Sequence, residues 1–310
     1  MTPNELITTA TRRWLNDETA ATYKWTQAEL VDYYNAFVDD ISRETDYILD
    51  TSTAAVSEII ISAGTGDYAY SALMIDGIRV YMSGSPTPLG HTTVGELMQI
   101  NDTWRYLASV AGTDISFADN TPSADTIIST TTDFTAVPIA ADDWIVINGS
   151  TSNNNTVQVA SVAAHLITLK TTATMTTEAA GDSVLIRVIN TGTPTNHLFD
   201  YRSGYITLYP CPDEAGKLII ESSRYQAVPM TVALLATATA ADIPIDSHYH
   251  LRMIDGILKY AYLKSGPSTF NIEKATVHGN RAGQLISDIK RDLIRLRASR
   301  KPMFAHQGTI

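Results

Sequence analysis

The sequence is poor in cysteine, in charge and in long apolar runs. Its single cysteine, Cys211, excludes an internal disulfide framework and a multi-cysteine metal site. Charged residues make up 18% of the chain, against about 25% in typical soluble domains, and 44% are hydrophobic. No run of about 18 apolar residues could span a bilayer, and the N-terminus lacks the apolar segment of a secretory signal. These absences favour a folded chain that is neither disulfide-stapled nor membrane-spanning.

Recognised catalytic motifs are also missing. The chain has no P-loop, no zinc-protease helix motif and no serine-hydrolase elbow. His248 and His250 stand two residues apart, which on a helix directs them to different faces, and no third ligand is near. Cys211 lies between two prolines with no adjacent base. We therefore predict that the protein is not an enzyme and that it uses no metal or cofactor.

Charge is distributed unevenly along the chain. The formal net charge is -11, which argues against a chain that coats nucleic acid. Residues 252–310 contain eleven bases and four acids, a net charge of +7, so the remainder carries −18. Such asymmetry is typical of a chain with a separate interaction segment.

The first strong pattern is an amphipathic helix over residues 27–49. Thr26 and Glu29 fit a capping box, and apolar residues recur at helical spacing after it. Acids fall between the apolar positions, and a solvated face is their simplest interpretation. The candidate acidic partner face consists of Asp32, Asp39, Asp40, Glu44 and Asp46.

Strand patterns occupy the middle of the chain. Residues 56–61 and 75–82 are rich in β-branched residues, and residues 204–210 and 217–225 predict a hairpin around a proline-containing turn. Residues 119–193 differ in composition, with Lys170 and Arg187 as their only bases, and consist of short alternating runs. This pattern predicts an inserted all-β domain, a small barrel or sandwich. Within it, Trp144 and an asparagine-rich loop could suit a sugar, although a core position is the favoured interpretation of Trp144.

The C-terminal part is predicted to be helical, over residues 246–262 and about 270–298. The second helix has an apolar stripe flanked by bases, and three interpretations stay open: a solvated helix, a nucleic-acid contact, or docking on an acidic protein surface, which we favour. Residues 299–310 have no period and are expected to act as an extended docking tail. The candidate docking residues are Arg291, Arg295, Arg297, Arg300, Lys301, Phe304 and Ile310.

Together these patterns predict an α+β chain. Residues 1–118 and 194–298 would form one discontinuous core, a helical bundle with antiparallel β-hairpins. Residues 119–193 would form the inserted domain, and residues 299–310 the tail. Repeated between copies, a basic face on an acidic face is a heterologous contact, and heterologous contacts can close into rings.

The order of these elements resembles tailed-bacteriophage head-to-tail adaptor (connector) proteins. The resemblance rests on the helix opening at 29–36 (ELVDYYNA), the strand and turn at 204–213 (GYITLYPCPD), the strand at 218–225 (LIIESSRY) and the helix from 248 to 262. It covers roughly residues 27–112 and 198–296, and residues 119–193 depart from the short members of the family.

The resemblance implies a structural virion protein without catalytic activity. Such adaptors form a ring, typically dodecameric, beneath the portal protein of the capsid, and so act at the head–tail interface after assembly in the host cytoplasm. They extend the channel through which genomic DNA passes without specific recognition, and offer a platform for a downstream tail or nozzle protein. The alternative is another tail module: a stopper, a tail-tube protein or a carbohydrate-binding tail protein.

Overall fold

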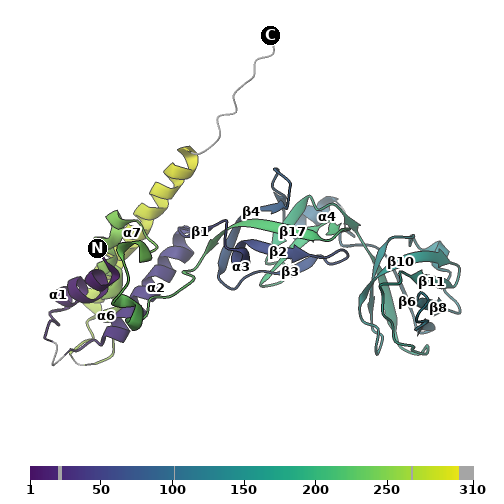
Figure 1. Cartoon of the computed structure of the whole chain (residues 1–310), viewed down its shortest axis with the longest axis horizontal. Coiled ribbons are helices and arrows are strands. Elements are labelled where there is room, and N and C mark those ends of the chain that lie inside the picture. The colour runs from purple at the N-terminus through teal and green to yellow at the C-terminus, as the bar shows by residue number, and fades with distance from the viewer. Residues whose placement is uncertain (20–22, 101, 267, 300–310) are drawn as a thin grey trace, which may run out of the picture. The chain divides into compact units, whose positions relative to one another are not determined.

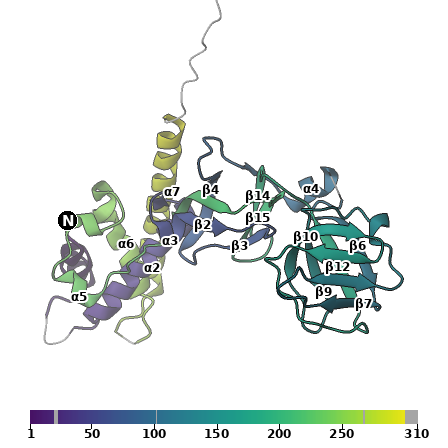
Figure 2. The same ribbon diagram turned by 45° about the vertical axis from the view of Figure 1, so that its right-hand side comes forward.

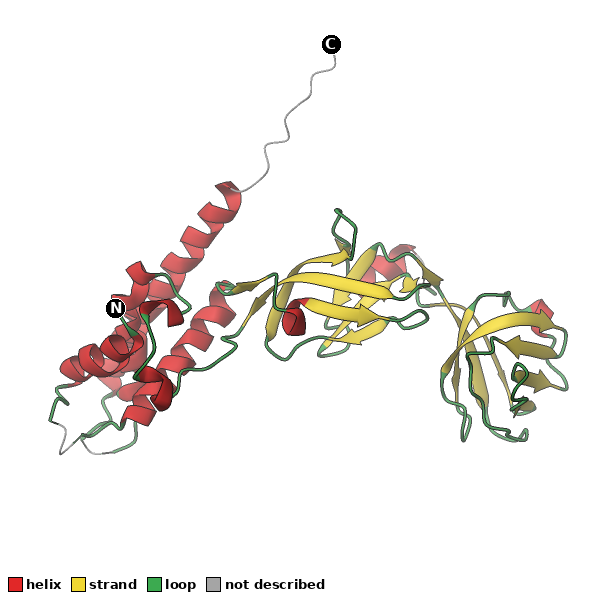
Figure 3. Cartoon of the chain, in the orientation of Figure 1, coloured by secondary structure: helices red, strands yellow, loops and turns green. Residues whose placement is uncertain are grey.

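The computed structural model describes residues 1–19, 23–100, 102–266 and 268–299. Helices and mostly antiparallel sheets are both present (Figures 1 and 3), so the predicted α+β class is confirmed. The chain divides into two compact units. The helical unit comprises Met1–Asp50, Leu73–Ile78 and Ser222–Ile310, and the β unit comprises Thr51–Ala72 and Arg79–Glu221. The predicted discontinuous core of residues 1–118 and 194–298 corresponds to neither unit.

The helical unit contains three long or medium helices and several short ones. Helix α2 spans Gln27–Thr45, α6 spans His250–Ala261 and α7 spans Ile272–Ser299. The shorter elements are η1 (Glu5–Ala10), α1 (Thr11–Leu15), α5 (Val232–Leu235), η4 (Ala240–Asp242) and η5 (Ser247–Tyr249), with strand β1 at Leu49–Asp50. The capping box at Thr26 is present, but α2 ends four residues before the predicted boundary, because Asp46 adopts left-handed backbone at φ 52°.

The apolar residues of α2 are buried on one side of the helix, as their spacing predicts. Its apolar stripe is buried against α6 and α7, in one cluster. Fully burying a side chain of this size contributes about 1.5–3 kcal/mol. The residues that form this core include Leu30, Tyr34, Phe37, Val38 and Ile41 of α2, Met253, Ile254, Ile257 and Leu258 of α6, and Ala282, Leu285 and Ile289 of α7.

Helices α2 and α6 approach each other closely at Gly256. A Cβ atom at Gly256 would lie 2.2 Å from two ring carbons of Phe37, which is 1% exposed. Only glycine fits this helix position, although glycine is a poor helix former. The Phe37 ring therefore fills the space that a side chain at Gly256 would need.

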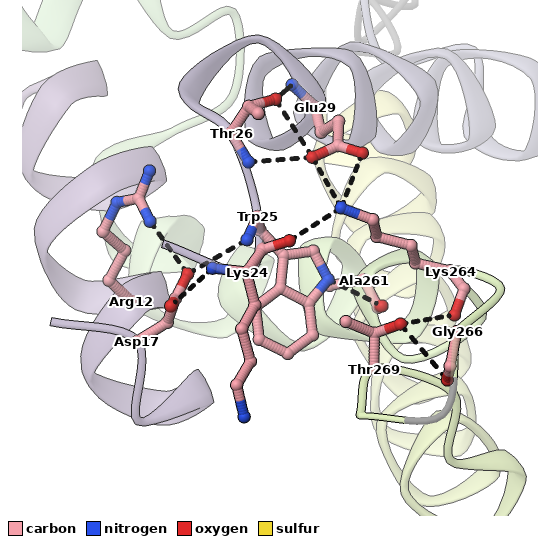
Figure 4. Close-up of polar contacts among 10 residues, drawn as sticks. All are labelled: Arg12, Asp17, Lys24, Trp25, Thr26, Glu29, Ala261, Lys264, Gly266 and Thr269. Carbon is pink, nitrogen blue, oxygen red and sulfur yellow. Dashed lines mark hydrogen bonds and ion pairs between the residues drawn. The ribbon is translucent and has the colours of Figure 1, made fainter. Parts of the chain in front are cut away.

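Hydrogen bonds join the segment before α2 to the start of the α6–α7 turn (Figure 4). The Asp17 carboxylate accepts hydrogen bonds from the backbone amides of Lys24 and Trp25, at 2.9 and 3.1 Å, and pairs with Arg12 at 3.0 Å. The Trp25 indole donates to the carbonyl of Ala261 at 2.9 Å. Because both Arg12 and Asp17 are buried, each depends on the other to remain charged there.

Besides a large sheet, the described residues form three small sheets. Their strands, apart from β1, are β2 (Glu58–Ile61), β3 (Asp67–Ala69), β4 (Met74–Met82), β5 (Gly90–His91), β13 (Thr191–Gly192), β14 (Asn196–Phe199), β15 (Tyr205–Tyr209), β16 (Cys211–Pro212) and β17 (Gly216–Arg224). Two short helices accompany them, α3 (Ala54–Ser57) and α4 (Val94–Ile100). One sheet has the order β1-β17-β2 with β4 also on β17, another the order β3-β15-β14-β5, and β13 pairs with β16. The strands predicted at 204–210 and 217–225 are β15 and β17; they lie in different sheets, so the predicted hairpin is wrong.

The large sheet has seven antiparallel strands in the order β6-β12-β9-β10-β11-β8-β7. Its strands are β6 (Tyr106–Gly112), β7 (Ile115–Ala118), β8 (Thr126–Ser129), β9 (Trp144–Asn148), β10 (Thr156–Ala163), β11 (Leu166–Leu169) and β12 (Val184–Ile189), with a 3₁₀ turn, η3, at Phe134–Ala136. Alternate residues face one buried cluster, as period 2 requires. The predicted boundary at residue 119 is too late, because β6 and β7 belong to this sheet and Ile115 and Phe117 to its core.

The seven-stranded sheet begins and ends at neighbouring points of the chain. Tyr106 pairs with Ile189, the Asn190 amide donates to the carbonyl of Arg105 at 3.1 Å, and the Asn190 side chain donates to the carbonyl of Trp104 at 3.1 Å. The first and last residues of the sheet are thus held side by side.

We expect Gly256→Ala to lower the free energy of unfolding by about 1–3 kcal/mol, because its methyl group would overlap the Phe37 ring. The matched control is Gly283→Ala on α7, where a Cβ atom meets nothing within 4 Å. That change should raise stability by about 0.5–1 kcal/mol. Urea denaturation followed by far-UV circular dichroism measures both, and equal effects of the two substitutions would refute the close-packing argument.

Candidate interaction surfaces

Three of the five predicted acidic-face residues are exposed on the helical unit. Asp32, Asp39 and Glu44 point into solvent from α2. Asp32 and Asp39 are seven residues apart and therefore share one face of the helix. Partial desolvation, together with the nearby Asp40 carboxylate, raises the pKa of Asp39. This face thus offers negative charge to a partner.

The other two acids are used inside the unit. Asp40 accepts a short hydrogen bond from the Tyr260 hydroxyl and pairs with Arg43 at 2.7 Å and Lys259 at 3.4 Å. Asp46 accepts from the Ser223 hydroxyl at 2.8 Å. Both carboxylates tie α2 to other parts of its own unit, so they are less available to a partner than the three exposed acids.

The basic residues of α7 are partly neutralised by acids on the same helix. Arg291 pairs with Asp288 at 2.8 Å, and Arg295 lies 3.7 Å from Asp292. In both i,i+3 pairs the guanidinium group is exposed and the acid is half-buried, and such surface pairs contribute about 0–1 kcal/mol. Both guanidinium groups therefore remain available to a partner.

The last turns of α7 extend past the residues that anchor it. Among the α7 residues whose side chains are described, which end at Arg295, Ile289 is the last fully buried one. Leu293 is partly buried, and Ile294 is 61% exposed between Arg291 and Arg295. Of the remaining docking candidates, Arg297 lies within α7 but its side chain is outside the described residues, as are Arg300, Lys301, Phe304 and Ile310.

Trp144 is half-buried. One face of its ring packs on Gly64, where a Cβ atom would lie 2.3 Å from an indole carbon, and φ at Gly64 is +72°. The indole nitrogen is shielded and makes no hydrogen bond. Trp144 is thus packed on one side without belonging to the buried cluster of the sheet.

The acids of the seven-stranded sheet organise its loops. The Glu178 carboxylate accepts from the Ser150 hydroxyl at 2.6 Å, from the amides of Thr151 and Ser152 at 2.9 and 3.1 Å, and from the Asn153 side chain at 2.9 Å. These donors, the Ser150 hydroxyl first, lower the pKa of Glu178 from 4.5 to about 2. The asparagine-rich loop is therefore held by hydrogen bonds to the Glu178 carboxylate.

Asp114 acts in the same way on another loop. It accepts from the Ser129 hydroxyl at 2.5 Å and from the amides of Thr130 and Thr131 at 2.9 Å. The Ser129 hydrogen bond is the main cause of a strongly lowered pKa at Asp114. The sequence alone gives no role to Asp114 and Glu178 beyond surface charge. In the structure they accept the hydrogen bonds that fix serine- and threonine-rich loops.

The residues considered for catalysis or metal binding have structural partners. Burial raises the pKa of the Cys211 thiol to about 12, which disfavours the reactive thiolate. His250 is buried with Nε2 2.7 Å from the carbonyl of Ile245, and His248 lies against the ring of Tyr249. Within the described ranges, no group of three histidine, cysteine or acidic side chains could hold a metal ion.

Sequence reasoning missed one feature of the β unit. Lys170 pairs with Asp142 at 2.7 Å, whereas the Arg187 guanidinium lies 5.1 Å from the centre of the Tyr106 ring. Among the ion pairs of the described residues, none includes Arg187. Arg187 is one of only two bases in residues 119–193, which marked it in the sequence. Its cross-strand neighbour, Ser109, follows only from the register of the sheet.

The chain matches no protein-family model and no curated protein sequence. In the described part of the chain, no helix combines the length and apolar character needed to cross a bilayer.

Acid should destabilise the β unit partly through Glu178. A carboxylate whose pKa is lowered on folding stabilises the fold above its unfolded pKa, and this stabilisation is lost as the pH falls from 4.5 towards 2. Glu178→Gln should lower the melting temperature at pH 7 by roughly 2–4 °C and reduce the further loss between pH 4.5 and 2.5. Glu214→Gln, in an exposed turn, is the control. Identical pH profiles for wild type and Glu178→Gln would contradict this role.

Proposed function

We propose that the protein is a structural virion component, a head-to-tail adaptor that forms a ring beneath a capsid portal. In this proposal it extends the DNA channel and provides the platform for a downstream tail or nozzle protein. The observation that carries the proposal lies near the end of α7, where Ile294 is exposed between Arg291 and Arg295, one turn beyond the fully buried Ile289. An exposed aliphatic residue flanked by arginines is typical of an interface anchor.

The same unit supplies a complementary surface. Asp32 and Asp39 share an exposed face of α2, so one copy can present acids to the arginines of the next. This contact uses two different surfaces of the same chain, and repetition of such a contact closes a ring when the rotation permits. The pairing needs no enzyme activity and no cofactor.

The finer fold description also belongs to this proposal. We interpret the helical unit as the bundle of the adaptor, and the seven-stranded sheet as an all-β domain inserted between Arg105 and Asn190. This is supported by the hydrogen bond that joins these two residues, because an insertion whose ends meet leaves its host chain continuous. The contact of one face of the Trp144 ring with Gly64 leaves at most the other face for a sugar, which weighs against the carbohydrate-binding alternative.

Charge reversal tests the subunit contact. Asp32→Lys with Asp39→Lys, or Arg291→Glu with Arg295→Glu, should reduce ring formation on portal particles on the order of tenfold or more, since like charges would then face each other. Combining all four changes in one chain should restore complementarity and rings. Negative-stain electron microscopy of the protein mixed with portal gives the count of rings.

The control is Asp213→Lys with Glu214→Lys, which makes the same charge change in an exposed turn of the β unit and should leave ring formation unchanged. Absence of rings with the wild-type chain and portal would overturn the proposal. Rings that persist in both reversed pairs would refute this contact.

Removal of residues 300–310 tests the docking tail separately. These residues include Arg300, Lys301, Phe304 and Ile310, and a segment with two adjacent bases and one aromatic anchor is suited to order on a partner. The shortened chain should bind portal rings at least tenfold more weakly in a sedimentation assay. Unchanged binding would show that the tail is not the portal contact.

A further inference from the structure

The two outer strands of the seven-stranded sheet differ in whether the backbone groups on their outer edge are hydrogen-bonded. On β7, the Phe117 amide donates to the carbonyl of Glu178, and the Glu178 amide donates back to Phe117, both at 2.9 Å. The Asp119 amide is also covered, by the Thr177 hydroxyl at 3.1 Å. The edge of β7 is therefore closed by the chain itself. Strand β6, at the other end of the sheet (Figure 2), pairs only with β12.

The register identifies the backbone groups on the open side of β6. The Ile147 amide donates to the carbonyl of Asn155, so odd-numbered residues of β9 bond to β10 and even-numbered ones to β12. By the same alternation, the backbone N–H and C=O groups of Ile186 on β12 bond to those of Val110 on β6. Ser109 and Ala111 consequently direct their backbone N–H and C=O groups away from β12. Both residues are exposed, and neither amide has a hydrogen-bond partner among the described residues.

This edge carries none of the usual protection against strand pairing. Natural sheets place lysine, proline or inward charges on exposed edges. Residues 108–112 read Ala-Ser-Val-Ala-Gly, without charge or proline, and the bulge opposite Val188–Ile189 affects only the start of the strand, at Leu107. An unprotected edge of this kind is suited to strand addition by a partner.

A groove with a positive group runs along the same edge. The groove has a volume of about 310 Å³ and is lined by residues 102–109 and Arg187. Leu107 is 49% exposed in it. Arg187 lies directly opposite Ser109 in the ladder and forms no ion pair with any residue that the structure describes. Asp102 lines the groove as well and would repel additional acids. The groove therefore favours a ligand with a single acid near Arg187 over a polyacidic ligand.

We propose that β6 is a docking edge for an extended segment of a partner protein, which pairs with Ser109 and Ala111 and places one acidic side chain towards Arg187. An added strand would lie two strand spacings from β12, about 10 Å. An arginine and a glutamate can meet over that distance because the residue between them is the small Ser109. On the other face, apolar side chains of the added strand would extend the core beside Ala108 and Val110, which already pack against it.

The probe is a fluorescein-labelled, end-capped peptide of seven residues, valine-threonine-valine-glutamate-valine-threonine-valine, titrated with the full chain. Fluorescence anisotropy should give saturable binding, and replacement of the glutamate by lysine should weaken it at least fivefold. Hydrogen exchange should slow at the amides of Ser109 and Ala111 in the bound state.

Three variants decide the mode of binding. Ser109→Pro removes a donor that the ladder does not use and should abolish binding, and Ser109→Lys, which keeps the backbone, should weaken it at least tenfold. Ser161→Lys is the matched control, because Ser161 is exposed on the interior strand β10 of the same sheet, and should bind like the wild type. Arg187→Gln should make the glutamate and lysine peptides bind equally.

Absence of peptide binding, unchanged binding in Ser109→Lys, or equal affinity of the wild type for the two peptides would overturn the proposal. Sedimentation velocity provides a further check. A concentration-dependent dimer of the wild type that Ser109→Pro abolishes would show that a second copy of this chain occupies the edge, which would also overturn it.

Discussion

The helical unit depends on how closely α2 can approach α6, and that distance is set where Phe37 lies on Gly256. The approach buries the apolar stripe of α2 and also brings Asp40 within reach of Lys259 and Tyr260. Packing at one glycine thus decides which carboxylates of α2 are consumed inside the unit and which stay at its surface. Asp32 and Asp39 remain exposed because they stand on the opposite side of the helix from this contact.

Polar groups in both units are used mainly to fix chain segments. In the helical unit, the buried pair of Arg12 and Asp17 holds the segment before α2, at a position where either partner alone would be a buried unpaired charge. In the β unit, Asp114 and Glu178 each collect several donors from one loop. A net charge of -11 therefore overstates the acidic surface that a partner can meet.

Periodicity and capping chemistry in the sequence were sufficient to predict α2, α6 and α7, because their signals are local: Thr26 and Glu29 form the predicted cap. The limits of the seven-stranded sheet were harder to place. Composition changes near residue 119, but sheet membership follows from pairing, and Tyr106–Gly112 joins the sheet through Val184–Ile189, more than seventy residues away. For the same reason, residue types alone could not tell Asp40, which Tyr260 occupies, from Asp39, which is free to act at the surface.

The meeting of the two ends of the seven-stranded sheet at Arg105 and Asn190 has an evolutionary consequence. A segment that leaves and rejoins its host at one point can be gained, lost or exchanged by recombination, since the host chain keeps its own pairing on either side. Relatives with a short loop at this position, or with an unrelated domain there, are therefore to be expected. The same junction offers protein engineers a place to graft a foreign domain whose own termini lie close together.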